Sequence, residues 1–535
     1  MKIFISVFLL FICITPNSLV WGSQQIETIQ FPSEDEIAEA YNLGEINLEQ
    51  FLILTELISN GIENTSFLLD EIPQSLLKFD TTNLEQSFIS LQSSRTPHFL
   101  LQNQYASYIE EDTRYRNQSS VTYTNKELLA QVTIKREYLD RERFTRRFIA
   151  YNPEDKNYNF IFGNFIKRFG LGGLIGYRGK VLSYTDVINK ESLLFPDFGG
   201  FNGLYFQSKN KALNFEFVTS YNRNAEYSLL TSGTNIELQN SIYPSLITAV
   251  NKFKNKLIDK NFDDLKISLY KKFDLKNVST SFEIGESFNK QKNSYFILSD
   301  GLYSASQVKL RYSFWSYGDS FYNFSGGGKT SVISEYEYIE SIDYNMLNKR
   351  SNQTGAILKS QFALSYDLLL DIATLYAYKN KDSTETELYG QLSKSFVPSL
   401  ELSVDFLHRI KIRLESMNDV PQKKTQSRFK MKYENNNMYV RNFLSVLKYA
   451  DSVTYAGFFT DIKLHTANYG IVQLWLNASH FNTTTHQLDY FYAFIRNEFE
   501  IQKTISFAFK VSHSYNRTAT TRNSNQFSFD ISWRI

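Results

Sequence analysis

The stretch that decides the fold is the C-terminal end of the chain, Gln526-Phe527-Ser528-Phe529-Asp530-Ile531-Ser532-Trp533-Arg534-Ile535. Large apolar residues occupy every second position from Phe527 to Ile535, and serine, aspartate or arginine fills the positions between them. Because successive side chains of a β-strand point to opposite faces, the apolar residues share one face and the polar residues share the other. A soluble edge strand would alternate too, but few such strands end a chain with so many large apolar residues on one face. The pattern favours a strand that turns its apolar face to lipid.

The same alternation continues upstream from about Tyr105. It occurs at 132–135, 213–217, 265–269, 308–314, 400–406, 429–433, 472–476, 488–494 and 505–511. Turn residues such as Asn435-Asn436-Asn437 separate these segments, and we expect longer loops near 186–202, 286–300, 340–355 and 415–424. About 430 residues of strand without a blade repeat or a linker make a poor array of soluble sandwiches.

The sequence therefore predicts a mainly β fold, a large antiparallel transmembrane β-barrel over 105–535 with a small N-terminal α-helical domain. At about 18–20 residues per strand and turn, the barrel would have roughly 20–24 strands, an even number that leaves both of its ends in the periplasm. The final strand resembles the closing strand of bacterial outer-membrane barrels, although its last residue is Ile rather than Phe.

Composition agrees with a barrel and excludes several other classes. Aromatic residues make up 16% of the chain and only 9 residues are proline, while the mean hydropathy is −0.33. These figures exclude collagen, coiled coils and disulfide scaffolds. No stretch after residue 22 offers 18 consecutive uncharged apolar residues, so the sequence predicts no membrane-spanning helix.

Residues 1–22 have the pattern of a secretory signal peptide. Lys2 precedes an apolar run from Ile3 to Ile14, and cleavage is expected between Gly22 and Ser23. The alternative, a membrane anchor, needs about 20 apolar residues, and Thr15-Pro16-Asn17 interrupts the run too early. The single cysteine lies inside this segment, so the mature chain has no thiol for a disulfide or a metal site. The expected location is the outer membrane.

An acidic segment follows the signal peptide. Residues 31–80 hold eleven acidic residues against one base, Lys78, a net charge of −10, so the rest of the chain is basic. Capping residues at Ser33 and Asn47 and a break at Pro73 predict short helices. We expect a periplasmic helical module over 23–80 and a linker over 81–104. The module is either a dock for a periplasmic protein partner at 31–80 or a cap or plug domain.

One internal stretch resembles a known family. Ile161-Phe162-Gly163-Asn164-Phe165 and Phe169-Gly170-Leu171-Gly172-Gly173-Leu174 are similar to the "G-(D/N)-aromatic … F-G-x-G" stretch of large bacterial outer-membrane barrels described as helix-hairpin-helix domain-containing proteins. The resemblance implies a signal peptide, an N-terminal helical-hairpin module and a porin-like barrel. It does not imply DNA binding, because Asn60-Gly61-Ile62-Glu63 lacks the second glycine of a phosphate-binding hairpin and lies in acidic surroundings. We expect no nucleic-acid partner.

The glycines from Gly170 to Gly179 do not predict a phosphate-binding loop. A G-x-G-x-x-G motif would need glycine where Ile175 stands, and no helix-period segment follows. Bends in barrel strands and close backbone approach are the expected reasons for the cluster.

No constellation indicates an enzyme, a metal site or a cofactor. The six histidines are scattered, and Ser403, Asp405 and His408 make a weak triad because a strand puts His408 on the opposite face. Charged residues expected on the polar, lumen-facing side could select solutes by sign or could pair across strands and fill the interior. The candidate lumen-lining residues are Lys309, Arg311, Glu401, Asp405, Arg428, Lys430, Lys432, Lys510 and Arg534, with Glu216, Lys266 and Asp530 expected on the same side.

Two functions remain open from the sequence. The first is a non-enzymatic, porin-like conduit for an unidentified solute, since a lumen of this size is open or plugged rather than filled by side chains. The second is a structural or assembly component of an envelope complex, in which the acidic module docks a basic partner. In either role the expected partners are outer-membrane lipid and the barrel-assembly machinery.

Overall fold

A computed structural model describes most of the chain after residue 97. The described residues are 98–108, 115–125, 127–136, 142–153, 156–165, 167–176, 201–223, 227–239, 242–255, 260–289, 293–305, 307–319, 321, 352–379, 383–397, 399–413, 422–435, 437–449, 454–466, 470–502, 505–517 and 523–534. The expected signal peptide, its cleavage site and the acidic helical module lie outside them.

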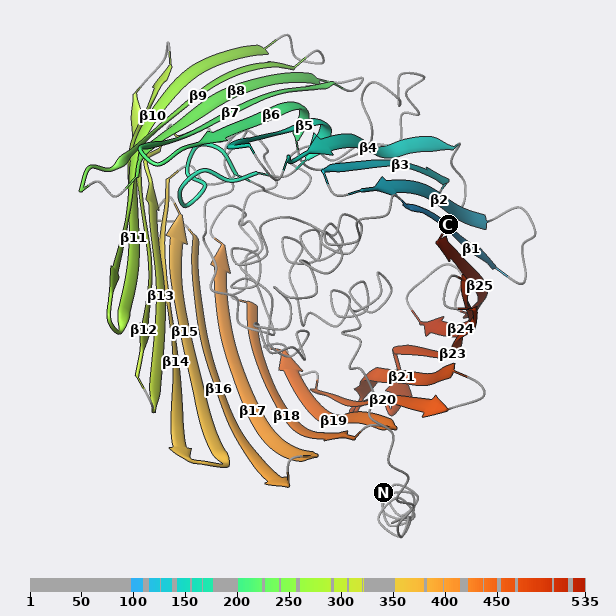
Figure 1. Ribbon diagram of the computed structural model, residues 1–535. Helices are drawn as coiled ribbons and strands as arrows, with labels where there is room; N and C mark the ends of the chain where they lie inside the picture. The colour runs from blue at the N-terminus through green and yellow to red at the C-terminus, as the bar shows by residue number, and fades with distance from the viewer. Residues whose placement is uncertain are drawn as a thin grey trace.

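The described residues form β-strands joined in sequence order (Figure 1). The first thirteen are β1 (His98–Tyr108), β2 (Tyr115–Thr124), β3 (Leu128–Arg136), β4 (Arg143–Tyr151), β5 (Tyr158–Phe165), β6 (Phe201–Lys209), β7 (Leu213–Arg223), β8 (Tyr227–Leu238), β9 (Ser245–Asn255), β10 (Lys260–Leu275), β11 (Val278–Asn289), β12 (Ser294–Ser304) and β13 (Val308–Tyr317). The others are β14 (Gln353–Ser365), β15 (Leu368–Lys379), β16 (Ser383–Val397), β17 (Leu400–Arg413), β18 (Gln422–Glu434), β19 (Met438–Tyr449), β20 (Thr454–Thr466), β21 (Gly470–Asn482), β22 (Gln487–Leu488), β23 (Tyr490–Gln502), β24 (Ile505–Asn516) and β25 (Asn523–Arg534).

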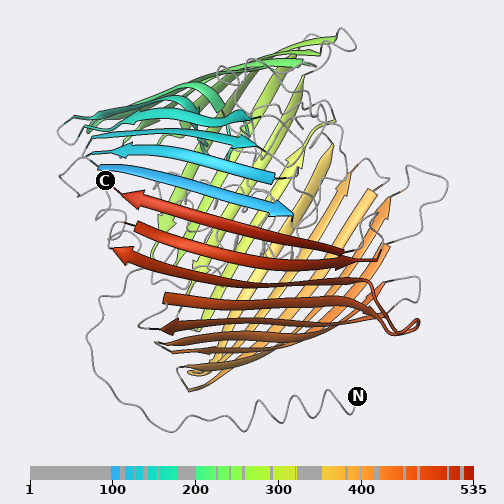
Figure 2. The same cartoon turned by 90° about the vertical axis from the view of Figure 1, so that its right-hand side faces the viewer.

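The sheet closes on itself. Each strand pairs antiparallel with the next one along the chain, and β25 returns to pair with β1, from Leu100 opposite Arg534 to Tyr108 opposite Gln526 (Figure 2). The two-residue β22 and the long β23 both pair with β21, so together they count as one strand of the wall. The strands β1–β25 therefore make a closed barrel of 24 strands. The mainly β antiparallel barrel and the range of 20–24 strands are confirmed. Within the described residues no helix is long and apolar enough to cross a membrane.

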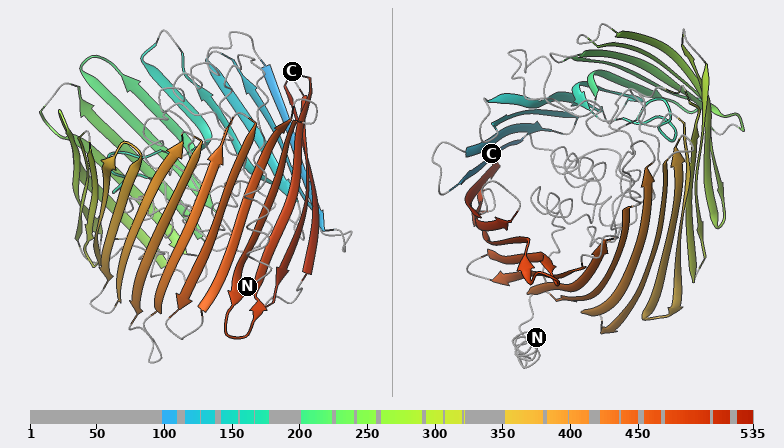
Figure 3. Two further views of the ribbon diagram at one scale, coloured as in Figure 1. Left: turned by 90° about the horizontal axis from the view of Figure 1, so that it is seen from below. Right: turned by 180° about the vertical axis from the view of Figure 1, so that it is seen from behind.

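The barrel is not circular in cross-section. The strands are tilted along the wall, and seen down the barrel the wall turns sharply at β10, so that β5–β9 and β11–β15 face one another (Figures 1 and 3). This corner brings the inner faces of two groups of strands close enough to share a cluster of buried side chains, described below.

The connections differ between the two ends of the barrel. At one end the strands are joined by tight turns, several of which begin with asparagine: Oδ1 of Asn125, Asn210 and Asn435 accepts the backbone amide three residues on. In the turn between β14 and β15, a hydrogen bond from the Ser365 hydroxyl lowers the pKa of Asp367. The two longest connections, 166–200 and 318–352, both leave from the opposite end.

Two sequence-based boundaries are wrong. β1 begins at His98, inside the segment 81–104 that was expected to be a linker, because Gln102 and Gln104 lie on the inner face of a strand rather than in a loop. Residues 286–300 belong mostly to β11 and β12 rather than to a long loop. Their polar residues Ser287 and Ser294 face each other across the ladder and are buried on the inner face.

The wall has an apolar outer face and a mixed inner face. Residues that lie opposite each other in neighbouring strands point to the same face of the sheet. Once the inward residues of one strand are known, the register therefore identifies the inward residues of every other strand. Large apolar residues on the outer face are exposed, for example Phe99, Val132, Leu265, Ile284, Val404, Phe429, Val446, Ile495, Phe509 and Trp533. Polar residues on the inner face are buried, for example Gln131, Lys266, Glu283, Asp405, Arg428, Gln473 and Ser512.

One strand departs from the expected alternation. Tyr490, Tyr492 and Phe494 of β23 were expected on the outer face, but Phe494 lies opposite the buried Trp475 and faces inward. The outer face of β23 carries Ile495 instead. The segment from Tyr490 to Ile495 is apolar on both faces, so its own sequence does not fix which face points outward.

Candidate functional site

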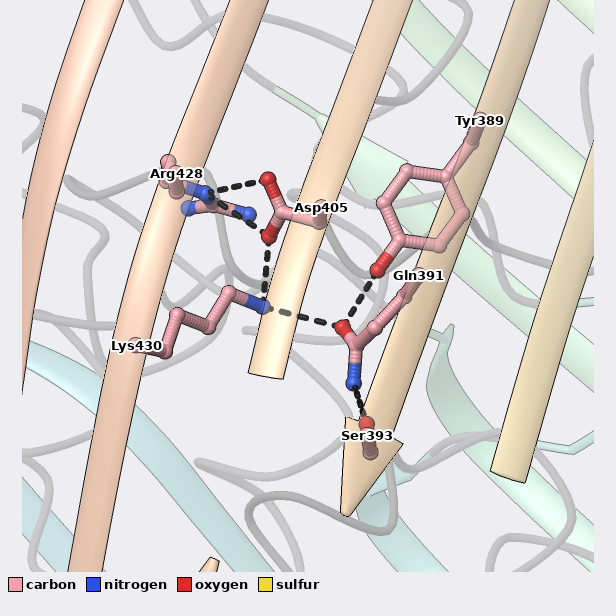
Figure 4. Close-up of polar contacts among 6 residues, drawn as sticks. All are labelled: Tyr389, Gln391, Ser393, Asp405, Arg428 and Lys430. Atoms are coloured by element: carbon pink, nitrogen blue, oxygen red, sulfur yellow. Dashed lines mark hydrogen bonds and ion pairs between the residues drawn. The ribbon is translucent and has the colours of Figure 1, made fainter. Parts of the chain in front are cut away.

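A network of charged and polar side chains lies on the inner face of β16, β17 and β18 (Figure 4). Asp405 accepts hydrogen bonds from Nε of Arg428 at 3.2 and 3.1 Å, and its Oδ2 lies 2.7 Å from Nζ of Lys430. Lys430 also donates to Oε1 of Gln391 at 3.0 Å. Asp405 and Arg428 are buried, so one carboxylate balances two cations away from bulk water.

The network continues along β16. Gln391 Nε2 donates to the hydroxyl of Ser393 at 2.7 Å, and the hydroxyl of Tyr389 donates to Gln391 Oε1 (Figure 4). These residues occupy alternate positions of one strand, so all three point inward. The result is a continuous row of donors and acceptors across three strands, which suits contact with water or a polar solute.

Further around the wall, cations pair with acids in the same way. Arg441 lies 3.8 Å from Asp461, whose other oxygen accepts Gln473 Nε2 at 3.0 Å. Arg496 lies 3.3 Å from Glu498. In each of these pairs, a cation on the inner face lies beside an acid.

An aromatic cluster lies beside these ion pairs and also faces inward. The rings of Phe459 and Trp475 meet edge to face at 5.2 Å, and Trp475 stacks on Phe494 at 5.6 Å. The guanidinium of Arg441 lies 5.0 Å from the centroid of Phe459, and Lys510 Nζ lies 4.1 Å from that of Phe494. Cations held over aromatic faces make a surface that can contact both anionic groups and flat apolar rings.

On the other side of the barrel, the segment 167–176 lies against the inner wall. Oε2 of Glu283 accepts the backbone amides of Leu171 at 2.7 Å and Gly173 at 3.3 Å, and Oε1 accepts the hydroxyl of Ser268 at 2.9 Å. Glu283 is fully buried. This carboxylate clasp, formed by Glu283 with the amides of 171 and 173, fixes the segment to β10 and β11 through charge-assisted hydrogen bonds.

The glycines of this segment have a different role from the expected one. Gly170 and Gly172 have positive φ, and a Cβ on Gly173 would lie 2.1 Å from the ring of Phe296. Close backbone approach was therefore correct, but strand bends were wrong, because these glycines lie in a connection after β5 and not in a strand. The amides of Leu171 and Gly173 donate to the protein's own carboxylate, Glu283, rather than to a phosphate.

Apolar side chains of the segment complete a buried cluster at the barrel's sharp corner. Phe169, Leu174 and Ile175 are fully buried against inward residues of β5–β15. The other members include Phe165, Phe201, Tyr205, Val218, Ile247, Phe296, Leu298, Trp315, Tyr317, Phe321, Ile357 and Leu375. At the edge of this cluster Lys266 Nζ lies 2.7 Å from Asp264, and both side chains are buried.

The register places the candidate lumen-lining residues on the inner face wherever their side chains are described. Asp405, Arg428 and Lys430 come together in the network of Figure 4, and Lys432 lies 3.1 Å from Glu434. Lys309 and Arg311 lie apart from them on β13, and Glu401 lies opposite Lys432. Lys510 belongs to the aromatic cluster. The side chain of Arg534 lies outside the described residues.

Three residues expected on the same side also face inward. Glu216 accepts the hydroxyl of Tyr205 and the amide of Asn235, both at 2.7 Å. Lys266 pairs with Asp264, and Asp530 lies opposite Ala508 on the inner face.

The weak triad is not assembled. Ser403 and Asp405 face inward, whereas His408 faces outward and its Nδ1 lies 2.9 Å from the hydroxyl of Thr425. Over the part of the chain that the structure describes, no group of three or more His, Cys, Asp or Glu side chains could hold a metal ion.

The inward aromatic cluster is the part of the site that the sequence did not predict. Phe458-Phe459 and Leu474-Trp475-Leu476 are runs of consecutive large apolar residues, which break the polar-apolar alternation. Such runs indicate a strand that is apolar on both faces. Here they mark Phe459 and Trp475 as inward aromatics.

Comparison with known proteins adds little to these observations. No protein-family profile matches the chain, and no curated protein is detectably similar in sequence, so the resemblance to helix-hairpin-helix barrels receives no support from them.

Solved structures of large barrels align over most of the chain with very low identity. The translocation pore of the P pilus usher PapC has 8% identity and a TM-score of 0.41, with 82% of this chain and 99% of that one covered. The siderophore receptor PirA from Pseudomonas aeruginosa has 6% identity and a TM-score of 0.45, covering 83% and 80%. The FrpB iron transporter from Neisseria meningitidis has 7% identity and a TM-score of 0.44, covering 84% of each chain. Scores this low do not establish a shared fold, so the barrel assignment rests on the closed strand ladder itself.

Proposed function

We propose that this protein is an outer-membrane β-barrel that serves as a porin-like conduit for a polar solute. The observation that carries the proposal is the contrast between the two faces of one closed ladder. Exposed Leu, Ile, Val and Phe side chains cover the outside, while buried ion pairs and amides share the inside with two apolar clusters. A water-soluble barrel would have the opposite arrangement, with its apolar residues inside.

Support for a membrane location comes from the outer face. An apolar band flanked by aromatic residues is the sign of a barrel in a bilayer. Some exposed aromatic side chains lie toward the ends of their strands, while others, such as Phe406 and Phe429, lie mid-strand among exposed aliphatic side chains such as Ile284 and Val446. The exposed aromatic residues near strand ends include Tyr221, Phe273, Tyr295, Tyr303 and Trp533.

Support for a conduit comes from the inner face. The network around Asp405 and the aromatic cluster around Trp475 occupy adjoining strands and offer charge, hydrogen bonds and flat apolar surface within one part of the wall. A polar solute with a ring, charged or uncharged, could replace its hydration shell step by step with contacts to these side chains. Because the ion pairs balance locally, we propose weak rather than strict selection by sign.

Planar-bilayer recording tests the proposal. Purified protein inserted from detergent is expected to give stepwise, ohmic currents. Protein that inserts stably but never conducts, and that co-purifies with other envelope proteins, would favour the second candidate, a structural or assembly component. Deleting residues 23–97 separates the two further, because this deletion leaves β1 complete. A conduit that lacks residues 23–97 should retain the wild-type bilayer current. An assembly component that docks its partner through 31–80 should no longer co-purify with that partner.

A further inference from the structure

The outer face carries a set of cations that differ from those inside. Arg223, Lys252 and Lys254 are exposed and face outward on β7 and β9. Lys423 and Lys448 are exposed and face outward on β18 and β19. All five lie within a few residues of a strand end on the side of the barrel that carries the long connections 166–200 and 318–352. We call these five residues the rim cations.

The register joins the first three into one patch. Arg223 lies opposite Ser228, Ser228 lies opposite Lys254, and Lys254 lies opposite Asn261, so these four form one row across the sheet. The next row is Tyr221, Leu230, Lys252 and Asp263. Neighbouring strands are about 4.8 Å apart, so the three cationic heads can reach a common point just beyond the strand ends.

The patch borders the apolar band directly. One row further along the strands, Val250 lies opposite Leu265, and both side chains are exposed. Tyr221 and Leu230 of the second row are exposed as well. An aromatic side chain at the edge of an apolar band, followed by cations, is the order expected where acyl chains end and headgroups begin.

Within the described residues, the rim cations have no ion-pair partner of the kind that the inner cations have. On the inner face, Lys266, Arg428, Arg441 and Arg496 each lie within 3.8 Å of a carboxylate. None of the five rim cations forms an ion pair with another described residue. Among the residues that the structure describes, Asp263, opposite Lys252, and Glu286 on β11 face outward near them, and neither forms an ion pair with a rim cation. At the opposite rim, by contrast, Lys394 lies 3.8 Å from Asp367.

We infer that the rim cations bind the phosphate groups of lipids in the surrounding leaflet, with Arg223, Lys252 and Lys254 as the principal site. Ser228 and Asn261 add hydrogen-bond donors in the same row. A free anion would gain only electrostatic attraction to the cations. A lipid phosphate is also held in place by its acyl chains, which contact Val250 and Leu265. The ligand is therefore a phosphorylated lipid rather than inorganic phosphate. This inference rests on the membrane location in the proposed function.

Lipid binding by the detergent-solubilised full chain tests the inference. The probe is fluorescent phosphatidic acid in neutral detergent micelles, with phosphatidylcholine as the probe of zero net charge. The variant R223Q/K252Q/K254Q removes the patch. The matched control K156Q/K211Q/K276Q removes three exposed lysines from turns at the opposite end. We expect the patch variant to bind phosphatidic acid about a hundredfold more weakly than the wild type, and the control to bind like the wild type.

Three results would overturn the inference: equal binding by the patch variant, equal loss in the control, or full displacement of the lipid by inorganic phosphate at moderate concentration. The patch variant is also expected to keep the wild-type bilayer current, because its side chains face away from the lumen. A wild type that binds phosphatidic acid but does not conduct would end the conduit proposal alone. A conducting variant with unchanged lipid binding would end this inference alone.

Discussion

The backbone amide of Leu171 donates a hydrogen bond of 2.7 Å to the carboxylate of Glu283, across 112 residues of sequence. The acceptor belongs to β11 and the donor to a connection that leaves the end of β5. The bond therefore helps the buried side chains of Phe169, Leu174 and Ile175 to hold the segment 167–176 against the wall. Its removal should change the interior of the barrel without breaking the ladder.

Glu283→Gln is expected to loosen the segment 167–176. The substitution removes the charge that strengthens the bonds to Leu171 and Gly173, which is a loss of about 1.5–3 kcal/mol. A Leu174→Cys reporter, introduced with Cys13→Ser, gives the measurement, because Leu174 is fully buried and Cys13 is the only cysteine. A charged maleimide should label the reporter roughly ten- to a hundredfold faster in the Glu283→Gln background.

Glu286→Gln is the matched control for that prediction. Glu286 lies three residues further along β11 but faces outward. Equal labelling rates in the two backgrounds would mean that the clasp does not hold the segment.

Asp405→Asn is expected to shift ion selectivity toward anions. Asp405 balances both Arg428 and Lys430, so its neutralisation leaves two cations on the inner face. Removing one partner of a buried ion pair also costs roughly 3–5 kcal/mol, so the variant should unfold at a lower urea concentration. The reversal potential under a potassium chloride gradient measures the selectivity, with Glu434→Gln at the rim of the same wall as the comparison. An unchanged reversal potential in Asp405→Asn would remove the network from the conduction path.

The sequence was sufficient where each strand has one apolar and one polar face. β25 from Gln526 onward and β10 from Leu265 to Leu269 alternate regularly, so the outward position of Phe529 and Leu265 followed from spacing alone. β23 shows where this reasoning ends. Its residues 490–495 are apolar on both faces, and only the register with Trp475 determines that Phe494 faces inward.

The sequence did not predict the long-range contacts, and the reason is different. The glycines at 170, 172 and 173 indicated close backbone approach, but nothing near Glu283 marks it as their partner. The two lie on separate elements, and the sharp corner at β10 that brings the walls together depends on the whole ladder (Figure 1). The sequence predicted part of the network around Asp405, because its charged residues were expected on the inner face. Which of these residues pair with one another depends on the register between β16, β17 and β18, which the sequence does not give.

Trp475→Ala is expected to destabilise the barrel by about 3–5 kcal/mol, the usual loss for a large buried aromatic. Trp475 contacts Phe459 and Phe494, and its truncation leaves a cavity between three strands. Trp475→Phe keeps most of the ring contacts and should lose far less. Urea unfolding of the refolded protein, followed by the fluorescence of the remaining tryptophans, gives the measurement. Similar midpoints for the Ala variant and the wild type would show that the inward cluster contributes little.

Phe529→Asp should block assembly of the barrel, whereas Ser528→Asp on the same strand should be tolerated. The first places a charge on the outer face, where lipid surrounds it, and charges near the bilayer midplane cost roughly 2–4 kcal/mol for Arg or Lys and less for Asp. Trp533→Asp in the same chain adds a second charge on that face. Ser528 faces inward opposite Lys510, so an aspartate there gains a cation. Heat-modifiable migration of unboiled samples reports assembly. If Phe529→Asp with Trp533→Asp migrated as a folded barrel while Ser528→Asp did not, the outer and inner faces would be reversed, and the lipid-facing assignment of every other strand in the ladder would reverse with them.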